Sequence, residues 1–303
     1  MIRSKSGAAT LSVVSNSVLI ALKIAAGAIT GSIAIITEAA HSSIDLIASV
    51  IALISVRKAD EPPDPEHPYG HEKVENLAAA IEGMLILVGA AIIVFEATRR
   101  LVVGAEVEHL GVGFAVIGVS AAANLGVSAY LGRRAREHRS PALEGDAAHL
   151  RTDAFTSIGV LVGLGLVQLT DNAVFDPIAA LAVAVAIVFS GIRILTGSSR
   201  VLVDEAPPAA ELDRIEGAIA AVRPPEMAGY HKLRARRAGA RRYVDLHVQF
   251  RSGTTLEDAH RLAHALRDAI EAEVPGSEVL IHVEPEGAVH DPRAPGATPY
   301  RAG

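Results

Sequence analysis

Six long apolar stretches occupy most of the chain as far as residue 200, and short polar segments separate them. They cover residues 8–30, 33–56, 77–98, 110–132, 142–169 and 177–198. A helix needs about 20 apolar residues to cross a bilayer, so each stretch predicts one membrane-spanning helix. Only Gly31 and Ser32 separate the first two stretches, which predicts a tight antiparallel hairpin. The pattern predicts a polytopic domain of six transmembrane helices over residues 1–205.

The pattern changes at Pro207 and Pro208, where the long apolar stretches end. Helical periodicity over 211–222 precedes alternating runs over 231–237 and 242–250, a helical segment over 255–273 and a strand over 278–283. This αββαβ order predicts an α+β domain of ferredoxin-like type over residues 206–287, with two helices on one face of a small sheet. The Pro-, Gly- and Ala-rich residues 288–303 predict a disordered tail.

Composition supports a membrane protein and narrows its chemistry. Half of the 303 residues are hydrophobic, and the mean hydropathy is +0.34. The chain has no cysteine, so a metal site must use His, Asp, Glu or water as ligands. The net charge of −6 gives no sign of nucleic-acid binding, which leaves the lipid bilayer and small ions as the expected partners.

Basic residues predict the orientation of the helices in the membrane. If six helices alternate in direction, nearly all basic residues that flank them fall on one side, which the positive-inside rule makes cytoplasmic. These residues are Arg3, Lys5, Arg57, Lys58, Arg133, Arg134, Arg136, Arg139 and Arg200. Both termini are therefore expected in the cytoplasm, with the protein in the cell (inner) membrane. Lys23 lies in mid-span and either snorkels or pairs with an acid such as Glu82.

One polar octet occurs twice inside the apolar stretches, as acid-x-x-His-x-x-x-Asp. The copies are 38–45 and 146–153. On a helix, a His and an Asp four positions apart share one face, so two facing copies offer two nitrogens and two carboxylates to a divalent metal ion. Charged groups inside a membrane are costly and mark functional sites. The predicted ligands are His41, Asp45, His149 and Asp153.

The first acid of each octet has several alternative roles. Glu38 and Asp146 lie one helical turn before the histidines on nearly the same face. They either orient the histidines as hydrogen-bond acceptors, pass protons, or are acids at a helix start or membrane interface.

Two further groups of residues are candidate metal ligands. Asp64, His67 and His71 lie within eight residues of a loop stiffened by Pro and Gly, although polar loops often contain histidines for other reasons. The soluble domain offers a third group on different predicted elements: His231, His247, His260, His282 and Glu284. Spacing alone does not show whether these side chains converge.

The sequence resembles the cation diffusion facilitator family of divalent-metal/proton antiporters over about residues 8–286. The resemblance rests on His41-Ser-Ser-Ile-Asp45, on His149-Leu-Arg-Thr-Asp153 and on the loop segment His67-Pro-Tyr-Gly-His71-Glu-Lys73-Val-Glu75. The order of six spans and an αββαβ cytoplasmic domain also fits this family.

The resemblance implies three metal sites. The intramembrane quartet would be the transport site, and Asp64 with His67 and His71 would form a loop site. The five soluble-domain residues would build a binuclear site at the interface of a homodimer. Glu284 stands where related proteins often have Asp, so its reach toward a metal ion differs.

The expected function is export of divalent metal ions from the cytoplasm in exchange for protons, with no enzymatic activity. Two imidazoles favour Zn²⁺, with Cd²⁺, Fe²⁺ and Co²⁺ as secondary substrates, because Mn²⁺ prefers more oxygen ligands. Zn²⁺ is then both the transported substrate and a bound regulatory ion. Alternatives are a manganese-preferring transporter and a membrane metal sensor or assembly factor that moves no ion. An intramembrane zinc hydrolase is disfavoured because the chain has no His-Glu-x-x-His motif.

Overall fold

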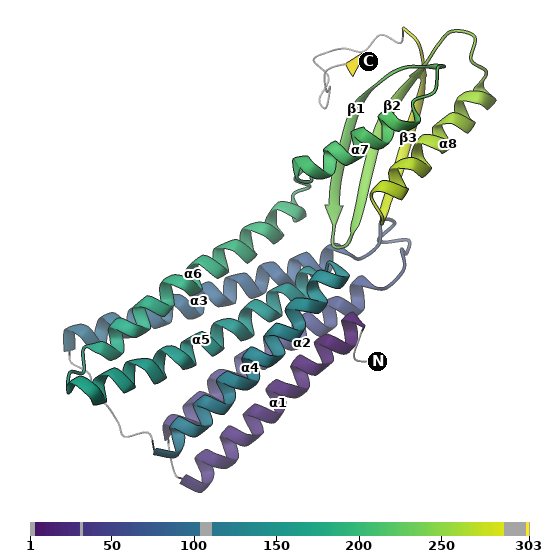
Figure 1. The fold of residues 1–303 in the computed structure, drawn as a ribbon. Coiled ribbons are helices and arrows are strands. Elements are labelled where there is room, and N and C mark those ends of the chain that lie inside the picture. Colours follow the sequence, from purple (N-terminus) through teal and green to yellow (C-terminus); the bar gives the residue numbers. More distant parts are fainter. Residues whose placement is uncertain (1–3, 31–32, 104–110, 288–300, 303) are drawn as a thin grey trace. The chain divides into compact units, whose positions relative to one another are not determined.

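A computed structural model describes residues 4–30, 33–103, 111–287 and 301–302. The chain divides into two compact units, residues 1–200 and residues 201–303. The first unit is a bundle of long helices (Figure 1). They are α1 (Lys5–Thr30), α2 (Ile33–Ala59), α3 (Lys73–Val103), α4 (Gly111–His138), α5 (Pro141–Thr170) and α6 (Phe175–Leu202).

Each predicted span lies almost wholly within one of these helices, which confirms the six-helix membrane domain. Within the described residues, five helices, α1, α3, α4, α5 and α6, are long and apolar enough to cross a membrane. The remaining helix, α2, has 27 residues and carries Glu38, His41 and Asp45 in its apolar sequence. The predicted turn at Gly31 and Ser32 lies outside the described residues.

The helix α5 has well-defined ends. Ser140 precedes it in an extended conformation and accepts a hydrogen bond from the backbone N–H of Leu143, while Pro141 occupies the first turn. Asp171 ends the helix in the left-handed conformation with φ 56°, and its N–H donates to the carbonyl of Val167. These caps fix where α5 begins and ends.

The second unit is a small α+β domain. It contains α7 (Ala209–Val222), β1 (Met227–Ala238), β2 (Arg241–Phe250), α8 (Leu256–Glu273), β3 (Ser277–Pro285) and β4 (Arg301–Ala302). The strand order is β3-β2-β1-β4, with β1 antiparallel and β3 parallel to β2. The order α7-β1-β2-α8-β3 confirms the predicted αββαβ domain.

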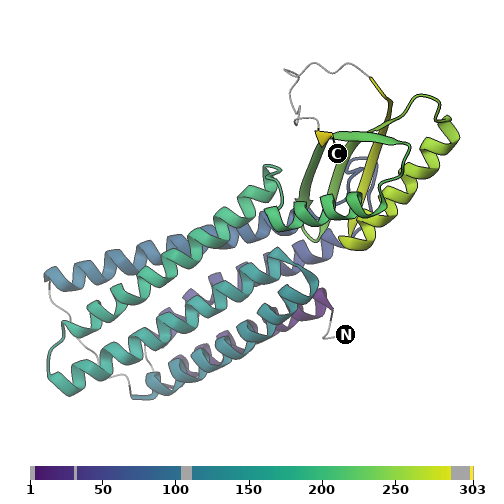
Figure 2. The same cartoon turned by 45° about the horizontal axis from the view of Figure 1, so that its top comes forward.

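Both helices of this domain cover the same face of the sheet (Figure 2). Ile215 and Ile219 of α7 pack in one core with Leu246 of β2 and with Leu266 and Ile270 of α8. Alternate residues of β2 point into this core, as the period of a strand requires. The intervening residues, His247 among them, therefore lie on the face away from the helices.

The end of the chain differs in part from the predicted disordered tail. Residues 288–300 and 303 lie outside the described residues, but Arg301 and Ala302 form the strand β4, which pairs with Tyr230 and Gly229. The pairing uses the part of β1 that precedes the predicted strand at residue 231, so the sequence pattern did not reveal this edge.

Candidate metal sites

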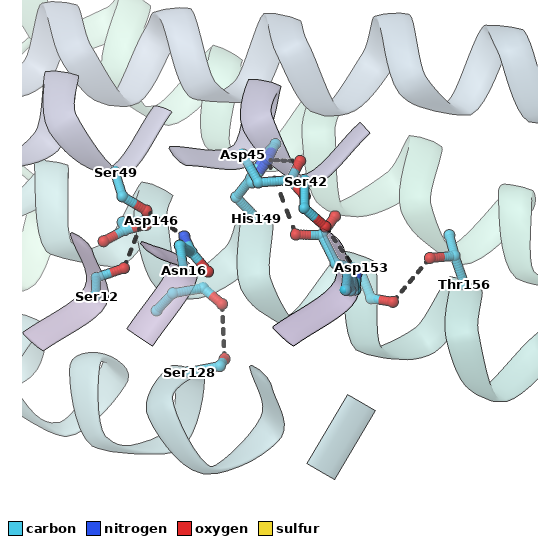
Figure 3. Close-up of polar contacts among 12 residues, drawn as sticks. Ser12, Asn16, Ser42, Asp45, Ser49, Ser128, Asp146, His149, Asp153 and Thr156 are labelled. Atoms are coloured by element: carbon cyan, nitrogen blue, oxygen red, sulfur yellow. Dashed lines mark hydrogen bonds and ion pairs between the residues drawn. The ribbon is translucent and has the colours of Figure 1, made fainter. Parts of the chain in front are cut away.

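The intramembrane candidate site joins α2 to α5. Nε2 of His149 lies 3.3 Å from Oδ1 of Asp45 and 3.9 Å from Oδ2 of Asp153. Figure 3 shows Asp45 and His149 facing each other between the two helices. Asp45 and His149 are each only 6% exposed, and the three side chains offer ligand atoms within 4.8 Å of one another. Such a spacing allows one metal ion to contact all three side chains.

His41, the fourth predicted ligand, lies on α2 one turn before Asp45. Its side chain is outside the described part of the structure, as is that of Glu38. The structure therefore brings together three of the four predicted intramembrane ligands and leaves His41 as a prediction.

Asp146 accepts a hydrogen bond from a serine of α2 and not from His149. Its Oδ1 accepts a hydrogen bond of 2.9 Å from the hydroxyl of Ser49, and Ser49 contacts Ser12 at 3.0 Å and Asn16 at 2.8 Å. Nδ1 of His149 is buried without a hydrogen bond among the described residues. Asp146 thus ties α5 to α1 and α2 (Figure 3) and does not orient His149.

Glu82 is a second buried acid that the sequence reasoning considered only as a partner of Lys23. The amino group of Lys23 instead donates to Ser42 at 2.7 Å. Glu82 is fully buried on α3, and neither of its oxygens has a hydrogen-bond partner in the described part of the chain. Its carboxylate lies against Gly145 on α5, directly before Asp146. The considered Lys23–Glu82 pair is therefore wrong.

The loop candidate site is built around Asp64. Oδ1 of Asp64 accepts hydrogen bonds from the backbone N–H groups of His67 at 2.6 Å and Glu66 at 2.9 Å, and it lies 3.1 Å from Nδ1 of His67. Oδ2 lies 3.2 Å from Nε2 of the buried His71. A left-handed turn at Gly70, with φ 87°, precedes His71. The short loop thus brings together all three predicted loop ligands.

Hydrogen bonds keep Asp64 in its charged form. Partial burial works against the charge, but the backbone and side chain of His67 and the backbone of Glu66 outweigh it and hold the pKa of Asp64 below its usual range. An ionised carboxylate beside two imidazoles is a suitable ligand set for a divalent ion.

In the soluble domain, strand pairing brings three histidines side by side. His231 pairs with His247 across β1 and β2, and His247 pairs with His282 across β2 and β3. Glu284 lies two residues beyond His282 and therefore on the same face of the sheet. Its Oε1 is 2.6 Å from Nδ1 of His247, and its Oε2 is 3.1 Å from Nε2 of His231.

The remaining predicted ligands of this domain are placed differently. His282 is more exposed, with Nε2 3.6 Å from Oε1 of Glu284 and its ring 4.6 Å from that of His247. His260 lies on α8 with an exposed side chain, and its ring is 4.4 Å from that of His264. Because α8 covers the opposite face of the sheet, His260 is separate from the other four ligands within one chain.

Comparison with known proteins identifies the family. The family model of the cation efflux transmembrane domain matches residues 9–203. The family model of the cation efflux protein cytoplasmic domain matches residues 207–286. The chain belongs to the cation diffusion facilitator, or cation efflux, family. The family expected from the sequence is thereby confirmed, and so is the general activity of a multi-pass cation efflux transporter.

Individual relatives match most of the cation efflux chain. An uncharacterized transporter of Synechocystis is 33% identical over 275 residues, covering 90% of this chain and 87% of that protein. The cation-efflux pump FieF of Klebsiella pneumoniae is 31% identical, covering 90% of each. A solved structure of the putative zinc transporter CzrB in its zinc form is 36% identical, covering 29% of this chain and 99% of that chain, with a TM-score of 0.27.

One polar group near the start of α3 was missed by the sequence reasoning. Glu75 accepts a 2.9 Å hydrogen bond from Lys5 of α1 and a short one from the hydroxyl of Ser140, the residue that caps α5. Lys5 also contacts Asp60 at 2.6 Å. The cap signal of Ser140 before Pro141 was visible in the sequence, but its buried partner was not. The group joins three helices of this cation efflux protein at one end of the bundle.

Proposed function

We propose that this cation efflux protein is a proton-coupled antiporter that exports Zn²⁺ from the cytoplasm, with Cd²⁺, Fe²⁺ and Co²⁺ as secondary substrates. In this proposal it works as a homodimer in the inner membrane with both termini in the cytoplasm. The observation that carries the proposal is the buried group of Asp45, His149 and Asp153, whose ligand atoms lie within 4.8 Å between two membrane helices.

The donor types support Zn²⁺ as the substrate. His149 supplies an imidazole nitrogen, and His41 would supply a second one from the helix that carries Asp45. Two nitrogens and two carboxylates suit tetrahedral Zn²⁺, whereas Mn²⁺ and Mg²⁺ prefer octahedral sites rich in oxygen.

Proton exchange follows from the same ligand atoms. A metal ion requires a neutral imidazole and ionised carboxylates, so protons and Zn²⁺ compete for His149, Asp45 and Asp153. Nε2 of His149 lies close to both carboxylates, 3.3 Å from that of Asp45 and 3.9 Å from that of Asp153. A proton on this atom therefore takes the place of the metal ion, and Zn²⁺ binding releases it.

We propose regulatory or accessory metal binding at the other two sites. Asp64, His67 and His71 offer one set of ligand atoms, and His231, His247 and Glu284 offer another. In the proposed homodimer, the exposed His260 of each chain supplies a metal ligand to the soluble-domain site of the second copy. The concentration of metal ions in the cytoplasm would then change the arrangement of the two chains in the dimer.

Flux measurements with the purified full-length protein in proteoliposomes test this function. We expect Zn²⁺ flux with the wild type and a loss of flux in His149→Gln. The control His138→Gln, at the last residue of α4, should retain the wild-type flux. A wild-type rate in His149→Gln would refute the transport site. Faster flux of Mn²⁺ than of Zn²⁺, measured in parallel with Cd²⁺ and Fe²⁺, would instead overturn the substrate.

A further inference from the structure

A cavity of about 180 Å³ lies between α5 and α6, and none of the candidate metal ligands is among its lining residues. Its lining combines apolar side chains, two hydroxyl groups and two arginines: Arg151, Thr152 and Phe155 of α5 and Phe189, Ser190 and Arg193 of α6. The volume is more than ten times the roughly 10–15 Å³ that a single water molecule requires. The cavity can therefore hold a group much larger than water.

The two arginines of this cavity have no countercharge in the described part of the chain. Both side chains are exposed, and neither guanidinium makes a hydrogen bond or ion pair there. Arg100, by contrast, pairs with Asp176 at 3.2 Å. A cation in a membrane helix is costly unless it reaches water, a headgroup or an anion. Two unpaired cations at one cavity therefore point to an anionic ligand.

Sequence position places both arginines in the same half of the membrane. Residues 154–170 of α5 and residues 177–192 of α6 contain no charged side chain. At 1.5 Å per residue each segment spans about 25 Å, close to the roughly 30 Å hydrocarbon thickness of a bilayer. Arg151 precedes the first segment and Arg193 follows the second, and the two helices run in opposite directions. Both arginines thus lie toward the same face of the bilayer, with Arg151 at the depth of His149 and Asp153, and their long side chains snorkel toward the lipid headgroups of that leaflet.

We propose that this cavity binds an anionic phospholipid, with the phosphate diester held by Arg151 and Arg193. Guanidinium groups bind phosphate through paired, charge-assisted hydrogen bonds, and basic pockets between membrane helices suit anionic lipid headgroups. Thr152 and Ser190 add hydroxyl groups to the lining. The exposed rings of Phe155 (43%) and Phe189 (72%) offer apolar surface to the acyl chains.

The lipid site and the intramembrane metal site use different faces of α5. Arg151 lies two positions after His149, a rotation of about 200° around the helix. The buried His149 faces α2, whereas the exposed Arg151 lines the cavity beside α6. The proposed phospholipid site therefore shares no ligand side chain with the metal site.

Native mass spectrometry of the full-length protein, with added phosphatidylglycerol or phosphatidylcholine, tests the proposal. Arg151→Gln/Arg193→Gln removes two charges at the cavity. Arg133→Gln/Arg136→Gln removes two exposed charges from α4 near the same end of the bundle and serves as the matched control. We expect phosphatidylglycerol binding to weaken at least about tenfold in the first variant, the loss of one charge-assisted hydrogen bond or more, and to stay at the wild-type level in the control.

Several results would overturn the proposal. Equal losses in the two double variants would indicate general charge attraction, and equally tight phosphatidylcholine would remove the need for an anionic lipid. Competition by inorganic phosphate at the same concentration would indicate a free-phosphate site. A shift from dimer to monomer without loss of lipid would show that a second copy of the chain occupies the cavity. Monodisperse elution of each variant in size-exclusion chromatography checks that it is folded.

Discussion

Replacing Gly145 by alanine tests the close contact between α5 and the buried acid of α3. A Cβ atom at this position would overlap Oε2 of Glu82 and would lie 3.2 Å from the backbone Cα of Ala79. Gly165, on the same helix, has nothing within 4 Å of such an atom in the described part of the chain. The two substitutions are chemically identical and differ only in their surroundings.

The magnitude follows from two opposing effects. Alanine is favoured over glycine inside a helix by about 1 kcal/mol, and this gain applies at both positions. Overpacking costs about 1–3 kcal/mol, and this cost applies only at Gly145, where a buried carboxylate and a backbone atom must give way. The stabilities of Gly145→Ala and Gly165→Ala should therefore differ by about 1–3 kcal/mol. At about 2–4 °C per kcal/mol for a domain of this size, this corresponds to roughly 2–12 °C in melting temperature.

Thermal unfolding in detergent, followed by size-exclusion chromatography after heating, measures this difference. Glu82→Ala should remove the overlap, so adding Gly145→Ala to that variant should cost much less than in the wild type. Glu82→Gln keeps the shape of the side chain and should keep the cost. If Gly145→Ala melts at or above the temperature of Gly165→Ala, the close packing of Glu82 on α5 is incorrect.

Two further predictions concern the soluble domain, prepared as residues 201–303. Arg242 holds Glu211 with two hydrogen bonds of 3.0 and 3.3 Å, and although burial opposes the charge, these bonds keep the pKa of Glu211 below its usual value near 4.5. The contribution of these bonds to the free energy of unfolding is present above pH 4.5 and is lost as the pH falls through the lowered pKa. Glu211→Gln should therefore lower the free energy of unfolding in urea by about 1–2 kcal/mol at pH 7 and by progressively less below pH 4.5. Asp268→Asn, which removes the exposed ion pair with Arg267, should cost at most about 1 kcal/mol. A loss of stability in Glu211→Gln that does not change with pH would contradict the ion pair between Glu211 and Arg242. Glu284→Gln should weaken the zinc affinity measured by calorimetry at least about tenfold, because even the loss of a residue that only hydrogen-bonds to a metal ligand has an effect of this size. The exposed Glu286→Gln should leave the zinc affinity unchanged. Equal zinc affinities of Glu284→Gln and the wild type would show that Glu284 is not part of the site.

The membrane helices could be predicted because each contains an uninterrupted apolar run, but their ends could not. The third helix begins at Lys73 rather than 77 and ends at Val103 rather than 98, since polar flanks continue the same backbone hydrogen bonds. In that helix Glu96 pairs with Arg99 and Arg100 at 2.9 and 3.0 Å, so charges that seemed to mark an end stabilise a further turn.

The metal sites could be predicted to different degrees. The loop site is local, so its spacing already contained the geometry. Alignment of His231, His247 and His282 depends on strand register, which includes an irregularity in β1 between His231 and Arg234 that a sequence pattern does not contain. The resemblance to a family supplied this grouping, and spacing did not.

The buried network around Asp146 was invisible for another reason. Ser12, Asn16 and Ser49 are common residues in membrane helices and carry no distinctive spacing. Only their burial on adjoining faces of α1 and α2 shows that Ser49 donates to the carboxylate of Asp146 on α5 while Ser12 and Asn16 bond to Ser49. Polar contacts between helices far apart in sequence require the packed structure.

Simultaneous recording of Zn²⁺ and pH inside proteoliposomes tests whether transport through the buried site exchanges Zn²⁺ for protons. We expect Zn²⁺ that enters the vesicles to be matched by protons that leave them. We also expect Asp153→Asn to abolish both signals, while Asp171→Asn, the same change at the exposed end of α5, keeps both. Zn²⁺ flux without a pH change would contradict proton exchange, and wild-type flux in Asp153→Asn would contradict transport through the buried site of α2 and α5.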